Sequence, residues 1–248
     1  MKPKYLAAGT TFTALATACA IAQTTSLSLP PSQNANPTTV VAIVTVVKPW
    51  YAPSFLVVNK MRDTQTQYAT LPGLAYKIYS VTQADSQFGG IYLWRDRTAA
   101  QGWFSPAWFE RVRKERGVEG TVRMFDAPVI LDNTPGGTPS NERSDSVATL
   151  VTIPIPLGIA REKLVAEFNA AVPTYQRVPG LLRKYFIITD DGKFGGVYLW
   201  DKQASGNQWF NESWQQRVRQ TYGAAATLEW FNTPILLPTQ TTAAKVNP

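Results

Sequence analysis

The 248-residue sequence predicts an α+β protein built from two tandem β-α-β-β-α-β modules. The main observation is a seven-residue stretch that occurs twice, as FGGIYLW at residues 88–94 and FGGVYLW at residues 194–200. When residues 88–131 are aligned with 194–237, 17 of 44 positions are identical. A second observation is that β-branched runs and amphipathic stretches surround both copies in the same order. The sequence therefore contains a tandem repeat of one module, and both copies should share a fold.

The first half of each module reads as a strand, a helix and a second strand. The first strand is predicted at residues 40–47 or 147–153, and each is followed by proline. The next helix, from residue 53 to about 69 in the first module, has a core stripe that repeats at matching places in the second module: Val57, Met61 and Tyr68 against Leu164, Phe168 and Tyr175. A Pro-Gly turn then precedes a strand at residues 74–81 or 181–189.

The repeated stretch is the third strand. Alternation along it puts Val197 and Leu199 on one face of the sheet and Tyr198 and Trp200 on the other. A second helix should end at the glycines 117 and 223, and a last strand covers residues 121–131 or 227–237. This is the ferredoxin-like arrangement, with both helices on one face of an antiparallel sheet. Because the other face also carries large side chains, we expect the two sheets to pack face to face.

The sequence also predicts segments outside the modules. Lys2 and Lys4 precede an uncharged run, and Ala20-Ile21-Ala22 offers a cleavage site, so export to a periplasmic or secreted location is expected. Two alternatives stay open: an uncleaved cytosolic tail, and lipoprotein processing with a lipid anchor at Cys19. The predicted division is a signal peptide at 1–22, a flexible spacer at 23–39, module 1 at 40–132, a linker at 133–146, module 2 at 147–238 and a disordered tail at 239–248.

Composition excludes several classes of function. The chain has no histidine, which rules out Ser-His-Asp and Cys-His catalysis and histidine-ligated zinc or haem. Cys19 is the only cysteine, so no intrachain disulfide can form. Loss of residues 1–22 removes two lysines and no acid, so the net charge falls from +7 to +5. The basic residues are scattered, which argues against nucleic acid as a partner, and no second apolar run is long enough to span a membrane.

A longer pattern carries a family resemblance. Pro-Gly-Leu is followed by Lys77 or Lys184, then by the repeated stretch, a Trp-rich helix and a closing Phe-x-x-Pro at residues 125–128 or 231–234. The chain thereby resembles the small monooxygenases of the dimeric α/β-barrel superfamily. The resemblance implies that the two modules pack sheet to sheet as a single-chain dimeric α/β barrel, an intramolecular pseudo-dimer that is monomeric as a chain.

The resemblance also implies an activity. Members of the superfamily oxidise aromatic polyketides or quinol-like molecules without metal or flavin, so no cofactor and no metal site are expected. Others degrade haem or cyclise polyketides, and several of these use a histidine that this chain lacks. The acidic residue that the family carries before Gly-Gly is replaced by Phe88 and Phe194. The implied function is a monooxygenase-like protein that acts on a small aromatic compound in an aromatic-lined cavity.

Four side chains of this pattern are candidate catalytic groups. A phenol of Tyr92 or Tyr198 would orient a quinol or bind its oxyanion, and the ammonium of Lys77 or Lys184 would stabilise a substrate anion. The alternatives are a plain core role for the tyrosines and snorkelling at a sheet edge for the lysines. Either way, the tyrosines point into the inter-sheet space or under the helices.

Four more residues are candidate substrate-binding groups: Trp94, Trp200, Arg123 and Glu229. The tryptophans would stack on a substrate ring or simply fill the core. Arg123 and Glu229 stand at corresponding positions with opposite charge, so either they pair across the pseudo-twofold or only one half keeps a functional pocket. A different class of function, a non-catalytic exported module that binds a hydrophobic small molecule or serves as structure, stays open.

Overall fold

The computed structural model describes residues 39–48, 53–134 and 145–238. The predicted signal peptide, nearly all of the spacer, most of the linker and the tail lie outside the described residues, and so does Cys19. Within the described part of the chain, none of the helices combines the length and the hydropathy that crossing a membrane requires.

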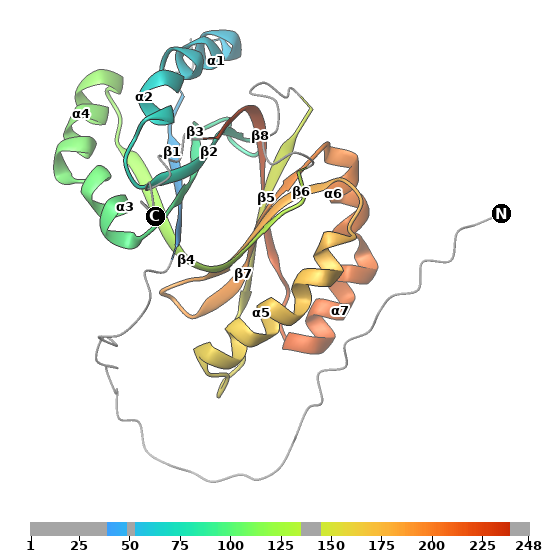
Figure 1. Ribbon diagram of the computed structural model, residues 1–248. Coiled ribbons are helices and arrows are strands. Elements are labelled where there is room, and N and C mark those ends of the chain that lie inside the picture. Colours follow the sequence, from blue (N-terminus) through green and yellow to red (C-terminus); the bar gives the residue numbers. More distant parts are fainter. Residues whose placement is uncertain (1–38, 49–52, 135–144, 239–248) are drawn as a thin grey trace, which may run out of the picture. The chain divides into compact units, whose positions relative to one another are not determined.

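Both modules have the predicted order of elements, with one short helix added to each. Module 1 consists of β1 (Val40–Val46), α1 (Ser54–Asp63), α2 (Gln65–Ala69), β2 (Leu74–Thr82), β3 (Phe88–Trp94), α3 (Arg97–Trp103), α4 (Pro106–Arg116) and β4 (Gly120–Asp132). Module 2 consists of β5 (Val147–Pro154), α5 (Arg161–Gln176), β6 (Leu181–Ile188), β7 (Lys193–Trp200), α6 (Gln203–Trp209), α7 (Glu212–Tyr222) and β8 (Thr227–Pro238). Figure 1 shows the helices of each module outside its own strands.

Local side-chain chemistry explains where the helices differ from prediction. The unpredicted helix α3 begins because the Asp96 carboxylate accepts a hydrogen bond from the Ala99 amide at 2.7 Å. The single helix predicted over residues 53–69 is divided at Thr64, whose hydroxyl donates to the Met61 carbonyl at 2.9 Å. The predicted ends of α4 and α7 are confirmed, since Gly117 and Gly223 both adopt the left-handed conformation with φ of 70°.

The strands form one closed antiparallel barrel in the order β1-β3-β2-β8-β5-β7-β6-β4. Within each module the order is that of a ferredoxin-like sheet, β4-β1-β3-β2 and β8-β5-β7-β6. The α+β ferredoxin-like prediction is confirmed. The two sheets were expected to pack face to face, and the structure also joins them at their edges, where β2 is hydrogen-bonded to β8 and β4 to β6. Each of the eight described strands therefore has a partner on both sides.

The two faces of the strands form different cores. The predicted division of the third strand is confirmed, since Val197 and Leu199 lie in a cluster to which all eight strands contribute, whereas Tyr198 and Trp200 pack under the helices. That central cluster occupies the barrel interior, and its buried members have exposed fractions of 7 % or less. Side chains of all eight strands therefore fill the centre of the barrel.

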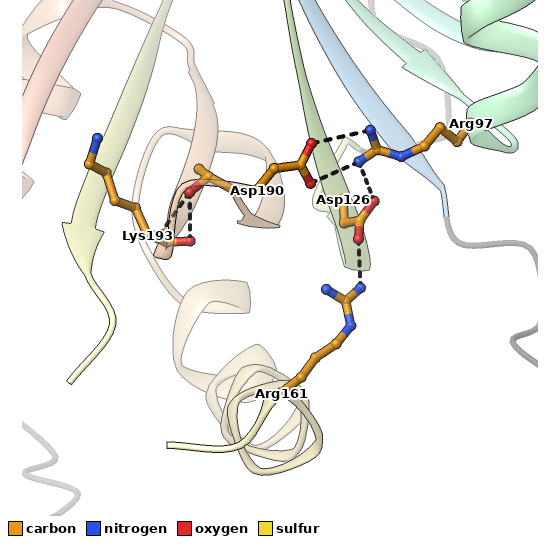
Figure 2. Close-up of polar contacts among 6 residues, drawn as sticks. Arg97, Asp126, Arg161, Asp190 and Lys193 are labelled. Carbon is orange, nitrogen blue, oxygen red and sulfur yellow. Dashed lines mark hydrogen bonds and ion pairs between the residues drawn. The ribbon is translucent and has the colours of Figure 1, made fainter. Parts of the chain in front are cut away.

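The two seams between the modules use different polar contacts. At the β4–β6 seam, Asp126 accepts hydrogen bonds from Arg97 at 2.8 Å and from Arg161 at 2.9 Å, and Arg97 also reaches Asp190 at 3.4 Å (Figure 2). Arg161 and Asp190 belong to module 2, so this carboxylate is shared between arginines of both modules. The network is partly buried, with the side chain of Asp126 20 % exposed.

The β2–β8 seam carries uncharged amides at matching positions. Gln203, Asn232 and Gln83 stand where the other seam has Arg97, Asp126 and Asp190. The Gln83 side chain donates to Gln203 at 2.7 Å and to Asn232 at 3.0 Å. The repeat has therefore diverged into one charged and one neutral seam.

We expect Asp126→Asn to lower the free energy of unfolding by about 1–2 kcal/mol, because two arginines lose a charged acceptor in a partly buried place. Urea unfolding followed by circular dichroism measures this. The exposed pair of Lys60 and Asp63, 3.4 Å apart, gives the control. Asp63→Asn should change stability by less than about 0.5 kcal/mol, and equal losses for both variants would contradict the seam's role.

Candidate functional site

The two candidate lysines are buried between sheet and helices. Lys77 on β2 and Lys184 on β6 are each 2 % exposed, which overturns the alternative of snorkelling at a sheet edge. Each lies opposite the candidate tyrosine of the next strand, Tyr92 or Tyr198. Gly90 makes room for the lysine stem, since a Cβ there would lie 3.3 Å from Lys77 Cε. The second glycine of the repeated stretch therefore shapes this site.

Aromatic rings surround each amine. Lys77 Nζ lies 3.0 Å from the ring centroid of Tyr68, 3.9 Å from that of Tyr79 and 4.6 Å from that of Tyr92. The counterparts around Lys184 are Tyr175, Phe186 and Tyr198, at 3.1, 3.8 and 4.6 Å. Among the described residues neither amine has a carboxylate partner. Burial lowers the pKa of both lysines well below 10.5, so both are disposed to the neutral amine.

The tyrosines beside the lysines keep their protons. Burial raises the pKa of Tyr92 and of Tyr198 well above 10. The ring centroids of Tyr92 and Tyr68 lie 5.7 Å apart, and those of Tyr198 and Tyr175 lie 6.0 Å apart. Each module thus holds a lysine amine next to a pair of neutral phenols, which can donate hydrogen bonds to an oxyanion.

The buried lysines make stability depend on pH. An unfolded lysine binds a proton below about 10.5, whereas the folded one stays neutral down to its lowered pKa, so in that window the unfolded state binds more protons and stability rises with pH. We expect the unfolding free energy to rise by at most about 1.4 kcal/mol per pH unit for each lysine. Urea unfolding from pH 6 to 9 measures the slope.

The double variant Lys77→Met/Lys184→Met tests this assignment, because it lacks both groups and should show the flatter profile. Lys60→Met, on the exposed face of α1, should keep the wild-type slope. Parallel profiles for the wild type and the double variant would show that the buried amines do not set the pH dependence.

Module 1 has a cavity beside its lysine. The cavity measures about 480 Å³ and lies between the outer face of the sheet and helices α1, α2 and α4. Lys77, Tyr68, Tyr79 and Tyr92 all line it. From the sequence, Tyr68 was expected only in the core stripe of the helix. Its recurrence as Tyr175, four residues before Pro-Gly in both modules, is the signal that could have marked it as a site residue.

The corresponding space in module 2 is filled by rings. Phe168 stands where module 1 has Met61, and its ring centroid lies 5.1 Å from that of Phe186. Tyr222 stands where module 1 has Arg116, and its ring packs on Phe194 at 5.1 Å. The lysine and its tyrosines are thus present twice, but larger aromatic side chains occupy the space around the second copy.

The tryptophans proposed for substrate binding are core residues in both modules. Trp94 and Trp200 are fully buried and stack behind Tyr92 and Tyr198, with centroid distances of 6.4 and 5.8 Å. Trp94 does not line the cavity of module 1. Trp94 therefore packs against the ring of Tyr92 on the side away from the cavity, and substrate binding by either tryptophan stays a prediction.

Arg123 and Glu229 lie at a different place. They border a second cavity of about 610 Å³ beside the β2–β3 turn. The Arg123 guanidinium donates two hydrogen bonds to the Glu229 carboxylate, at 2.8 and 2.7 Å. Of the two alternatives drawn from their opposite charges, pairing between the modules is the one found. A substrate at this place would have to compete with that pair, and their predicted binding role stays untested.

A known protein family matches part of module 1. Residues 53–131 match the family described as "Putative mono-oxygenase ydhR". The first module is thus similar to the ydhR family. The cavity beside Lys77 lies in this ydhR-like module. No curated protein matches the chain.

Solved structures share the fold of the whole described chain. A putative monooxygenase from Fusobacterium nucleatum is 14% identical, with 82% of this chain and 95% of that one covered and a TM-score of 0.59. A putative monooxygenase from Lactobacillus acidophilus is 13% identical, with 81% and 96% covered and a TM-score of 0.53. An anthrone oxidase-like protein is 10% identical, with 86% and 98% covered and a TM-score of 0.53. At these identities the likeness establishes the ferredoxin-like fold alone.

Proposed function

We propose that the protein is a cofactor-independent monooxygenase that oxidises a small aromatic compound in the cavity of module 1. One observation carries the proposal: the buried amine of Lys77, without a carboxylate partner among the described residues, borders that cavity in the ydhR-like module. Desolvation favours a neutral amine, which is a base at ordinary pH. The independence from a cofactor rests on the family resemblance.

The chemistry suited to this site begins with removal of a proton. The Lys77 amine takes a proton from an acidic ring CH₂ group of an aromatic ketone, and the resulting ammonium pairs with the enolate. The phenol of Tyr92 or Tyr68 donates a hydrogen bond to the enolate oxygen. The enolate carbon then bonds to O₂, the ammonium returns its proton to form a hydroperoxide, and loss of water leaves a carbonyl. In total CH₂ and O₂ give C=O and H₂O, so no external reductant is required.

Anthrone is a suitable first substrate, since one similar structure is described as anthrone oxidase-like. The purified full chain should consume one O₂ for each anthraquinone formed, faster than anthrone oxidises in buffer. An oxygen electrode and absorbance measure the two quantities. The same rate with and without protein, for anthrone, hydroquinones and phenols alike, would reject the proposed activity.

The barrel supports a further structural proposal, that one chain replaces a dimer of identical modules. The edge pairs β2–β8 and β4–β6 join the modules as equivalent edges, and the Fusobacterium match is long enough to span both modules. We expect a monomer in light scattering. A stable dimer at micromolar concentration would contradict this.

Export remains a proposal based on residues 1–22. Native mass spectrometry of the chain from its own envelope fraction should show a mature mass that begins after Ala22, or a lipid on Cys19. A full-length unmodified chain would contradict export. A mass excess lost on denaturation would identify a retained ligand.

A non-catalytic binding or structural role is the second candidate. The packed centre of the barrel favours it, because tightly packed side chains between the sheets are what a structural module requires. Tight binding of an aromatic ligand without oxygen consumption would support this role over oxidation.

A further inference from the structure

The entrance of the module 1 cavity is rich in cationic side chains. Lys60 on α1 and Arg111 and Arg116 on α4 line the cavity, and all three are exposed. Glu115 is the one acidic residue among those that line it. The two arginines act on the cavity itself: although burial raises the pKa of Tyr68, the charges of Arg111 and Arg116 oppose that rise.

The two arginines differ from Lys60 in their partners. Among the described residues neither guanidinium forms an ion pair, whereas Lys60 is 3.4 Å from Asp63. Arg111 instead lies over the ring of Trp103 at 5.8 Å, and Arg116 over the ring of Phe88 at 5.6 Å. A ring face holds a guanidinium without using its N–H donors. These donors stay available, and a carboxylate is the group that matches their geometry.

Module 2 does not repeat this charge pattern. Glu167 and Tyr222 stand where module 1 has Lys60 and Arg116, and only Arg217 keeps the charge of Arg111. Burial and then the charge of Glu167 raise the pKa of Tyr222, so this carboxylate acts on the ring that helps to fill the space. The cationic entrance and the open cavity therefore occur together in module 1.

We propose that the cavity of module 1 selects an aromatic compound that carries a carboxylate group. The ring would lie in the cavity beside Lys77, and the carboxylate would bind Arg111 and Arg116 at the entrance. The inference rests on the proposed function, since it takes the same cavity as the substrate site. It goes beyond that function because it names a charged group of the substrate, at a distance from the atom that reacts.

Binding of two matched probes to the full chain tests this without any turnover. Naphthalene-1-carboxylate and 1-naphthalenemethanol have the same ring and differ in charge, and isothermal titration calorimetry gives both dissociation constants. We expect the carboxylate to bind at least about tenfold more tightly, as one or two charge-assisted hydrogen bonds allow. Arg111→Gln/Arg116→Gln should weaken the carboxylate about tenfold and leave the alcohol within about twofold.

Arg217→Gln in module 2 is the control and should change neither constant, because Arg217 is the exposed counterpart of Arg111 beside a filled space. Equal affinities for the two probes, equal weakening of both by the double variant, or equal weakening by Arg217→Gln would each overturn the inference. The anthrone assay tests the proposed oxidation independently of carboxylate binding. Carboxylate selection without oxidation would reject the enzyme and keep the anion site, and oxidation without selection would do the reverse.

Discussion

Lys77→Met is expected to reduce the oxidation of anthrone by at least about 100-fold, the usual contribution of a positioned general base. Methionine fills a similar volume without a charge, so the rings of Tyr68, Tyr79 and Tyr92 keep a neighbour. Initial rates of oxygen uptake measure the effect, and a thermal melt confirms that the variant is folded.

Lys184→Met is the matched control for this prediction. Lys184 has the same burial and a similar set of rings, but Phe168 and Tyr222 occupy the space around it. We expect its oxidation rate to stay within about twofold of the wild type, because a residue that does not meet substrate contributes little to the barrier. Equal losses in the two variants would place the activity in both modules. An unchanged rate in Lys77→Met would remove the lysine from the mechanism.

Gly89→Ala is expected to prevent folding or to destabilise the chain by more than about 4 kcal/mol, a size that requires a severe steric cause. A Cβ at Gly89 would lie 1.9 Å from the carbonyl oxygen of Val44 on the neighbouring strand β1. Backbone atoms on both sides of this contact are fixed by strand pairing, so the strain cannot be relieved by a rotamer change. The first glycine of the repeated stretch is thus required by the close approach of two strands.

Gly102→Ala is the control for this glycine, because a Cβ at that exposed helical position would meet nothing within 4 Å. It should leave stability unchanged or raise it by up to about 1 kcal/mol, since alanine favours helix. Soluble yield and urea unfolding of the two variants give the comparison. A Gly89→Ala chain as stable as the wild type would show that β1 and β3 are not as close as the structure has them.

Several features of the fold were predictable because they depend on neighbours in the sequence. The period of two along the third strand separated Val197 and Leu199 from Tyr198 and Trp200, and the structure puts these pairs in different cores. The glycines after α4 and α7 marked both helix ends. The short helix α3 was missed, although Asp96 is a residue type that caps helices.

The sequence predicted which residues form the candidate site better than it predicted where the cavity lies. Lys77 and Tyr92 were both predicted as catalytic groups, and the structure places them opposite each other on β2 and β3, where they line one cavity. The aromatic cavity was expected between the sheets or under the helices, and the structure places a cavity under the helices of module 1. Whether a cavity exists there depends on the combined volume of side chains that lie far apart in the sequence. Met61 in module 1 and its larger counterpart Phe168 in module 2 are an example, and no local sequence pattern predicts the volume that remains.

The sequence by itself determined the two modules, the order of their elements and the face to which each strand residue points, because all of these follow from local periodicity and turn chemistry. Only the tertiary structure decided that the edges join β2 to β8 and β4 to β6, and that Arg123 pairs with Glu229. It alone decided that Lys77 borders a cavity. Strand partners and leftover volume are set by long-range packing, in which each contact depends on all the others.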